Sequence, residues 1–129
     1  MSSRTVGHYE GWSLSRSCDA RDPEDLDITA MTHVNFAFVY FHPTTFQITP
    51  MSADDVPLYN RFTNLKTKKP LLKTWISVGG WSINDAGNAP DTRTAFSDMA
   101  SSAANRQAFI ASLTQFMKTY NFDGVDIDW

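Results

Sequence analysis

Residues 122–129 read FDGVDIDW, and this stretch places three aspartates within six positions of an otherwise apolar segment. In an extended strand alternate side chains share a face, so Asp126 and Asp128 point one way and the apolar residues beside them point the other. We expect the apolar set to pack on helices and the two carboxylates to project from the opposite face. Two like charges in a partly buried site tend to share a proton, and this arrangement suits acid and base chemistry.

Three further apolar runs predict strands, and each is bounded by turn-forming or polar residues. They are TVGHY near residue 6, HVNFAFVYF from His33 and TWISVGGW from Thr74. Together with the final stretch they predict four strands spread along the whole chain.

Helices are expected between these strands. The clearest covers residues 105–120 and is expected to end at Asn121 in the left-handed conformation. A second is predicted over about 54–66, and a shorter one after Asp22, where Pro23 follows a capping aspartate. The apolar faces would be Phe109, Leu113, Phe116, Met117 and Tyr120 in the first helix and Leu58, Phe62 and Leu65 in the second.

The alternation of strands and helices predicts parallel strands joined by right-handed crossovers and covered by helices on at least one face. The fold class is therefore α/β. A doubly wound sheet and an eight-stranded barrel both fit, but a barrel typically takes about 250 residues, so this chain would supply only about half of one. No linker or internal repeat marks a domain boundary.

Composition excludes several function classes. The net charge is −3 and the basic residues are scattered, so we expect neither nucleic acid nor an anionic membrane as a partner. No apolar run reaches the roughly 18 residues that span a bilayer, and no signal peptide is visible. Cys18 is the only cysteine, and the three histidines lie in different segments without ligand spacing, so no metal site is expected.

The stretch SVGGW, residues 77–81, ends the third strand with two glycines. Gly79 and Gly80 permit a tight turn and a close approach to the backbone, and no phosphate-binding motif follows them. Trp81 offers the flat apolar face on which sugar rings stack. Each feature taken alone has a plainer interpretation, because glycine pairs often form simple turns, tryptophans pack in cores and strand aspartates face solvent.

Together these stretches resemble glycoside hydrolase family 18. FDGVDIDW resembles the D-G-x-D-x-D-W-E signature of the family's fourth strand, and SVGGW resembles the S-x-G-G motif of its third. THVNFAF and VGHYEGW are similar to its second and first strands, and the likeness is greatest to fungal chitinases, including the killer-toxin-like group. The resemblance implies that residues 1–129 are the N-terminal part of a single catalytic domain, with the first four β/α units of an incomplete TIM-type barrel.

The resemblance also implies a chitinase that cleaves β-1,4-linked N-acetylglucosamine polymers with retention of configuration, assisted by the substrate's own acetamido group and without a cofactor. Asp128 matches the catalytic aspartate that orients the acetamido group, and Asp126 matches the deeper one that shares its proton. Substrate-binding positions are matched by Tyr9, Phe36, Ser77, Gly79, Gly80 and Trp81, and structural positions of the motif by Asp123 and Gly124.

The family signature continues with a glutamate, the general acid, directly after the position of Trp129. Because it lacks this proton donor, a polypeptide of these 129 residues is expected to be inactive on chitin. It is also expected to self-associate, because the outer strands of a half-barrel have unpaired edges. His8 stands where the family often has an aromatic residue.

Two alternative functions stay open: a non-catalytic chitin-binding lectin of the same fold, and a family 18 endo-β-N-acetylglucosaminidase. Chitin or chitooligosaccharides are the expected partners. The chain itself does not reveal the compartment, and an extracellular location is expected for the parent protein.

Overall fold

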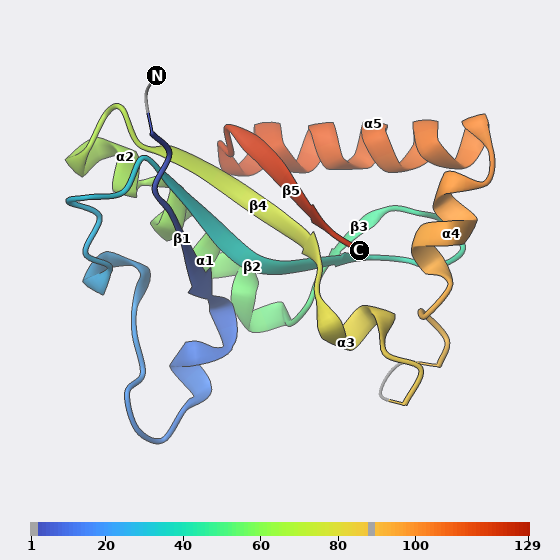
Figure 1. Ribbon diagram of the computed structural model, residues 1–129, viewed down its shortest axis with the longest axis horizontal. Coiled ribbons are helices and arrows are strands. Elements are labelled where there is room, and N and C mark those ends of the chain that lie inside the picture. Colours follow the sequence, from blue (N-terminus) through green and yellow to red (C-terminus); the bar gives the residue numbers. More distant parts are fainter. Residues whose placement is uncertain (1–2, 88–89) are drawn as a thin grey trace.

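The computed structural model describes residues 3–87 and 90–129, and its centre is a single twisted sheet (Figure 1). In this part of the chain the sheet has five strands, of which four are parallel in the order β1, β2, β4, β5, while β3 pairs antiparallel with β2. The four predicted strands are confirmed, whereas β3 was not predicted. The strands are β1 (Val6–Glu10), β2 (His33–Phe41), β3 (Ile48–Pro50), β4 (Lys73–Gly79) and β5 (Gly124–Asp128).

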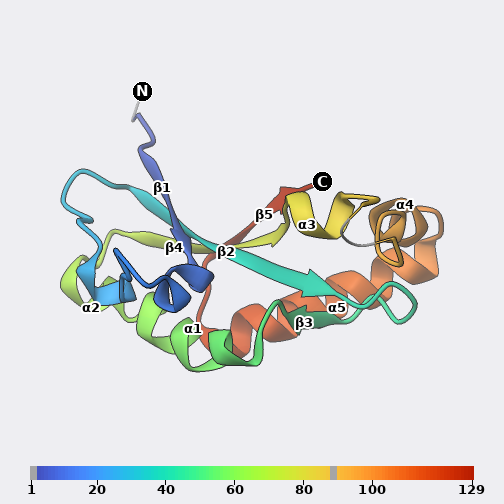
Figure 2. The same ribbon diagram turned by 90° about the horizontal axis from the view of Figure 1, so that it is seen from below.

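Helices α1, α2 and α5 lie along one face of the sheet, and within the described residues no helix covers the other face (Figure 2). The chain thus forms the first four parallel strands of a TIM-type barrel, with the segments that connect them, as an open sheet. In the same residues no helix is long and apolar enough to cross a membrane. The helices are α1 (Val56–Thr63), α2 (Leu65–Lys68), α3 (Trp81–Asn84), α4 (Ala95–Ala100) and α5 (Ala103–Tyr120), and the 3-10 turns are η1 (Gly11–Ser15), η2 (Pro23–Asp25) and η3 (Ala53–Asp55).

Local sequence sets the helix ends. The Ser102 side chain accepts a hydrogen bond from the Asn105 backbone N–H and begins α5 two residues before the predicted start. Asn121 ends it in the left-handed conformation, with φ 62°, as predicted. The helix predicted after Asp22 is only the 3-10 turn η2, because Leu26 returns to extended backbone at φ −65° and ψ 127°.

The hydrophobic core lies between the sheet and the helices. Phe36 and Ile76, on β2 and β4, are fully buried, and Phe62 of α1 packs on Phe36 with ring centroids 5.4 Å apart. Phe41 of β2 contacts the rings of Phe96 and Phe109 at the other end of the layer. The predicted inward residues Leu58, Phe62 and Leu65 are all buried, as are Phe109 and Leu113, while Phe116, Met117 and Tyr120 are partly buried.

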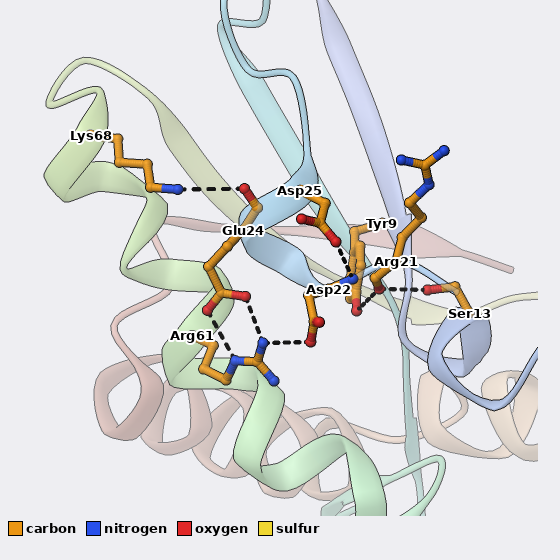
Figure 3. A network of polar contacts seen from close by, with 8 residues as sticks. All are labelled: Tyr9, Ser13, Arg21, Asp22, Glu24, Asp25, Arg61 and Lys68. Carbon is orange, nitrogen blue, oxygen red and sulfur yellow. Dashed lines mark hydrogen bonds and ion pairs between the residues drawn. The ribbon is translucent and has the colours of Figure 1, made fainter. Parts of the chain in front are cut away.

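The segment between β1 and β2 contains only 3-10 turns, and ion pairs fasten it to α1 (Figure 3). Arg61 of α1 donates hydrogen bonds to both carboxylate oxygens of Glu24, at 2.9 and 2.6 Å, and to Asp22 at 2.5 Å. The hydrogen bond from Arg61 holds the pKa of Glu24 below its usual value. Lys68 adds a bond of 3.4 Å to the Glu24 carbonyl, so this loop is held against the helix layer.

Candidate active site

Strand register defines the face of the sheet that carries the candidate site. Ala37, Ser77 and Asp126 are neighbours across β2, β4 and β5, on the face that no described helix covers, and we call it the open face. Phe38 is an extra residue in β2, because the register shifts between Ala37 and Val39. The shift turns Phe38 toward the open face, where its ring stacks on Trp12 at a centroid distance of 5.9 Å.

The two candidate catalytic aspartates stand at the C-terminal end of β5. Ser77, which is fully buried, donates a 2.8 Å hydrogen bond from its hydroxyl to Oδ2 of Asp126. Asp128 is two residues further along the strand, so it shares that face, and it is exposed. Among the described residues no hydrogen bond is recorded between the two carboxylates, and proton sharing between them stays a prediction.

The glycine pair fixes the backbone of Asp128. Gly79 and Gly80 have φ values of 118° and 91°, in the region that only glycine adopts readily. A Cβ on Gly79 would lie 2.1 Å from the Asp128 carbonyl oxygen, and one on Gly80 would lie 2.8 Å from the Phe38 ring. The Gly80 N–H donates a 2.9 Å hydrogen bond to the Asp128 carbonyl oxygen, so the turn after β4 holds the end of β5 in place.

Asp123 and Gly124 act at the opposite end of β5. Oδ2 of Asp123 accepts bonds from the Thr74 N–H at 2.9 Å and from Lys66 Nζ at 3.0 Å. Burial would raise the pKa of Asp123, but the Thr74 and Lys66 hydrogen bonds outweigh it and the pKa lies below its usual value. A Cβ on Gly124 would lie 2.5 Å from Nε1 of Trp75. These contacts anchor the strand on β4 and support the interpretation of both residues as structural.

A cavity of about 400 Å³ opens beside the ends of the strands, and we call it the aromatic cavity. Trp81 is 79% exposed there, and its indole N–H donates to Asp85 at 3.2 Å. Sequence reasoning singled out Trp81 but neither Trp12 nor Tyr40, although Trp12 follows the first strand much as Trp81 follows the third. The lining residues are Trp12, Phe38, Tyr40, Met51, Trp81 and Ser82.

Tyr9 and Phe36 do not line the site, and the expectation that they bind substrate is wrong. They are register partners on β1 and β2 and face the helix layer, 2% and 0% exposed. The Tyr9 hydroxyl donates to the Arg21 carbonyl at 2.9 Å (Figure 3), and Phe36 packs against Tyr59 of α1. Burial, ahead of other causes, raises the pKa of Tyr9. Both residues are core, and the aromatic residues of β2 that line the aromatic cavity are Phe38 and Tyr40.

The strand ends carry a serine-anchored aspartate, a second aspartate beyond it and an aromatic cavity alongside. The model of the family described as glycosyl hydrolases family 18 matches residues 4–129. The chain belongs to glycosyl hydrolase family 18. The fungal, killer-toxin-like subgroup stays a prediction.

Individual family 18 relatives are similar over nearly all of this chain. Chitotriosidase-1 of Mus musculus is 37% identical over 127 residues, which is 98% of this chain and 25% of the relative. The crystal structure of the Ostrinia furnacalis group IV chitinase in complex with allosamidin has a TM-score of 0.86 at 32% identity, covering 98% of this chain and 33% of that one. Human YKL-39, a pseudo-chitinase with retained chitooligosaccharide-binding properties, has a TM-score of 0.77 at 26% identity. The match covers 98% of this chain and 33% of YKL-39. The chain therefore spans a quarter to a third of the length of these family 18 proteins.

Proposed function

We propose that the full-length protein is a retaining chitinase that hydrolyses β-1,4 linkages between N-acetylglucosamine units. The observation that carries the proposal is the hydrogen bond from Ser77 to Asp126 on the open face, with Asp128 two residues beyond it at the strand end. Family membership over residues 4–129 and the solved chitinases of similar fold support it.

The proposed mechanism gives each aspartate one task. Asp128 accepts a hydrogen bond from the N–H of the substrate's acetamido group and aims the acetamido oxygen at the anomeric carbon. That oxygen forms a bond to the carbon as the glycosidic bond breaks, giving an oxazolinium ion that water then opens with net retention. Asp126, held by Ser77, supports Asp128 from below and exchanges a proton with it. The proton for the leaving oxygen comes from the glutamate that follows the Trp129 position in the family signature.

The aromatic cavity supports a polysaccharide substrate. Trp81 is 79% exposed and stands directly after the glycine turn that holds Asp128, so a sugar ring resting on its indole would lie next to the aspartates. The Ostrinia furnacalis chitinase of similar fold is solved in complex with allosamidin, and YKL-39 retains chitooligosaccharide binding. We infer that chitooligosaccharides occupy this cavity and extend from it toward Asp128.

A polypeptide of only these 129 residues is proposed to bind chitooligosaccharides without turning them over, since it carries no group in the place of the family's glutamate. Its outer strands, β1 and β5, leave Val6 and Ile127 49% and 46% exposed, and such edges favour self-association.

The test is hydrolysis of chitooligosaccharides by the full-length protein and by its Asp128→Asn variant. We expect the variant to lose activity by about 10² to 10³-fold, the scale for removing one group that stabilises the transition state. Asp98→Asn is the matched control, because Asp98 is an exposed acid of α4 whose recorded side-chain partner is Thr94. Equal activity of wild type and Asp128→Asn would refute the proposal.

A second candidate is chitooligosaccharide binding without catalysis, favoured by the likeness to YKL-39. Binding by a full-length protein that hydrolyses no chitooligosaccharide would support it. Release of N-glycans from a glycoprotein in preference to chitooligosaccharides would instead indicate the endo-β-N-acetylglucosaminidase.

A further inference from the structure

A second cavity, of about 370 Å³, lies between the turn η1 and the start of α1, and we call it the acidic cavity. Trp12 and Met51 line both this cavity and the aromatic cavity, so the two cavities are adjacent. Its lining combines apolar side chains with two carboxylates and includes no lysine, arginine or histidine. The lining residues are Gly11, Trp12, Leu14, Ser15, Met51, Ser52, Asp54, Asp55 and Leu58.

Asp55 is the unusual group in this lining because it is a carboxylate with only 2% of its surface exposed. Oδ2 accepts a 3.1 Å hydrogen bond from the Ser52 N–H, which caps the turn η3. Among the described residues no hydrogen bond is recorded at Oδ1. That oxygen lies against Gly11, where a Cβ would be 2.7 Å away, so the absence of a side chain at Gly11 leaves room for it, and both residues line the cavity.

The carboxylate of Asp55 has no basic side chain as a partner among the described residues. In the described part of the chain no salt bridge reaches it, and its charged neighbour Asp54 has the same sign. The pKa of Asp55 lies above its usual value. Burial is the main cause and the nearby charge of Asp54 adds to it, and together they outweigh the Ser52 hydrogen bond, which acts in the opposite direction. A buried carboxylate of this kind is stabilised by a cation that enters the cavity and donates hydrogen bonds to the free oxygen.

Trp12 suggests what carries the cation. Trp12 borders both cavities and its ring stacks on Phe38, so a sugar chain in the aromatic cavity would contact a residue that also lines the acidic cavity. An ammonium group close to an indole and a carboxylate gains from both. In a polymer of N-acetylglucosamine the unit that carries an ammonium group is one that has lost its acetyl group.

We propose that the acidic cavity is a subsite for a glucosamine unit, with the ammonium group bound by Asp55 and the ring against Trp12. This inference rests on the proposed function and names a substrate class for it: partially deacetylated chitin, bound with a free amino sugar away from the cleavage point. The acetylated unit that the chemistry requires stays at Asp128.

The experiment compares two hexasaccharides, one of N-acetylglucosamine only and one partially deacetylated, in binding to the isotope-labelled 129-residue chain at a concentration at which gel filtration shows a monomer. Isothermal titration gives the affinities, and amide chemical shifts locate the contacts. The variant is Asp55→Asn, which keeps an oxygen acceptor for the Ser52 N–H but removes the charge. Asp27→Asn is the matched control, since Asp27 is an exposed acid outside both cavities whose recorded hydrogen bond comes from the Thr29 N–H.

We expect Asp55→Asn to bind the partially deacetylated hexamer about tenfold more weakly than wild type, as for the loss of one charge-assisted hydrogen bond. Asp27→Asn should bind both hexamers as wild type does, and Asp55→Asn should bind the acetylated one unchanged. In wild type the partially deacetylated hexamer should shift the amide signals of Trp12, Ser52 and Asp55, a readout that holds even if the variant fails to fold.

Binding of both hexamers with equal affinity, with shifts at Trp81 and none at Ser52 or Asp55, would overturn the glucosamine subsite and leave the proposed function standing. Failure of wild type to bind either hexamer would overturn the inference, whereas the proposed function is tested separately by hydrolysis with the full-length protein.

Discussion

The Ser77 hydroxyl donates a 2.8 Å hydrogen bond to Oδ2 of Asp126, and the two residues are register partners on the parallel strands β4 and β5. The strand pairing itself therefore fixes the deeper aspartate. Because Ser77 is fully buried, this carboxylate has a rigid neighbour on the side away from the strand end. A site held by strands is positioned more accurately than one held by loops.

Replacing Ser77 by alanine should impair catalysis more than folding. The variant removes the hydrogen bond that Ser77 donates to Asp126. We therefore expect kcat of the full-length protein to fall about tenfold or more, the scale for losing a contact that orients a residue of the site. The free energy of unfolding should fall by about 1 kcal/mol. Ser102→Ala, which removes the cap of α5, is a matched control with a similar loss of stability. An equal effect of the two variants on kcat would show that the Ser77 bond has no catalytic importance.

Gly79→Ala should destabilise the fold severely. The added methyl carbon would lie 2.1 Å from the Asp128 carbonyl oxygen, and the φ of 118° is strained for alanine. We expect a loss of about 3 kcal/mol or more in the free energy of unfolding, measured by urea denaturation. Gly87→Ala is the control, because a Cβ there would make only ordinary contacts at 3.5 Å or more. A Gly79→Ala variant as stable as Gly87→Ala would contradict the described turn.

Asp123→Asn should make stability less dependent on pH. The pKa of Asp123 is lower in the folded chain than its usual value, so its stabilisation is present above that usual value, about 4, and is lost as pH falls through the folded pKa. We expect the variant to be about 1 to 2 kcal/mol less stable than wild type at pH 7. The difference should shrink in acid, and urea unfolding at several pH values measures it. A difference that stays constant down to pH 2 would exclude the electrostatic contribution of Asp123.

Trp81→Ala should weaken sugar binding without affecting the fold. Because Trp81 is 79% exposed, its removal costs little core packing, while the aromatic cavity loses its most exposed aromatic side chain. We expect about a tenfold loss of affinity for chitooligosaccharides by isothermal titration, the scale for one aromatic contact. Leu71→Ala, which removes an apolar side chain 87% exposed and outside the cavity, should bind as wild type does. Unchanged affinity of Trp81→Ala would rule out Trp81 as a binding surface.

The sequence was sufficient for the four parallel strands and for α5, because long apolar runs and the caps of a long helix are strong local signals. It was not sufficient for β3 and α4, which have three and six residues and no periodic pattern long enough to detect. The helix predicted after Asp22 failed because the capping signal specifies a start but not a length. Tertiary contacts, here the Arg61 ion pairs, hold that segment instead.

The candidate site was predicted in part. Asp126, Asp128 and Ser77 share the open face, as strand alternation requires. Phe36 was assigned to the site by its position in a stretch similar to the family's second strand, whereas its regular pairing with Tyr9 and Ile76 places it on the helix side. No local pattern in HVNFAFVYF reveals that the extra residue Phe38 lines the cavity instead. Trp12 was overlooked because it follows β1 in a turn, where its packing on Phe38 depends on residues distant in sequence.

The most direct test of the central claim is the anomeric form of the first product released from a chitooligosaccharide by the full-length protein, followed by proton NMR from the start of the reaction. Substrate-assisted hydrolysis at Asp126 and Asp128 predicts the β-anomer first, with the α-anomer appearing only by mutarotation. Initial release of the α-anomer would mean that water attacks the sugar directly, and it would contradict the role assigned to Asp128.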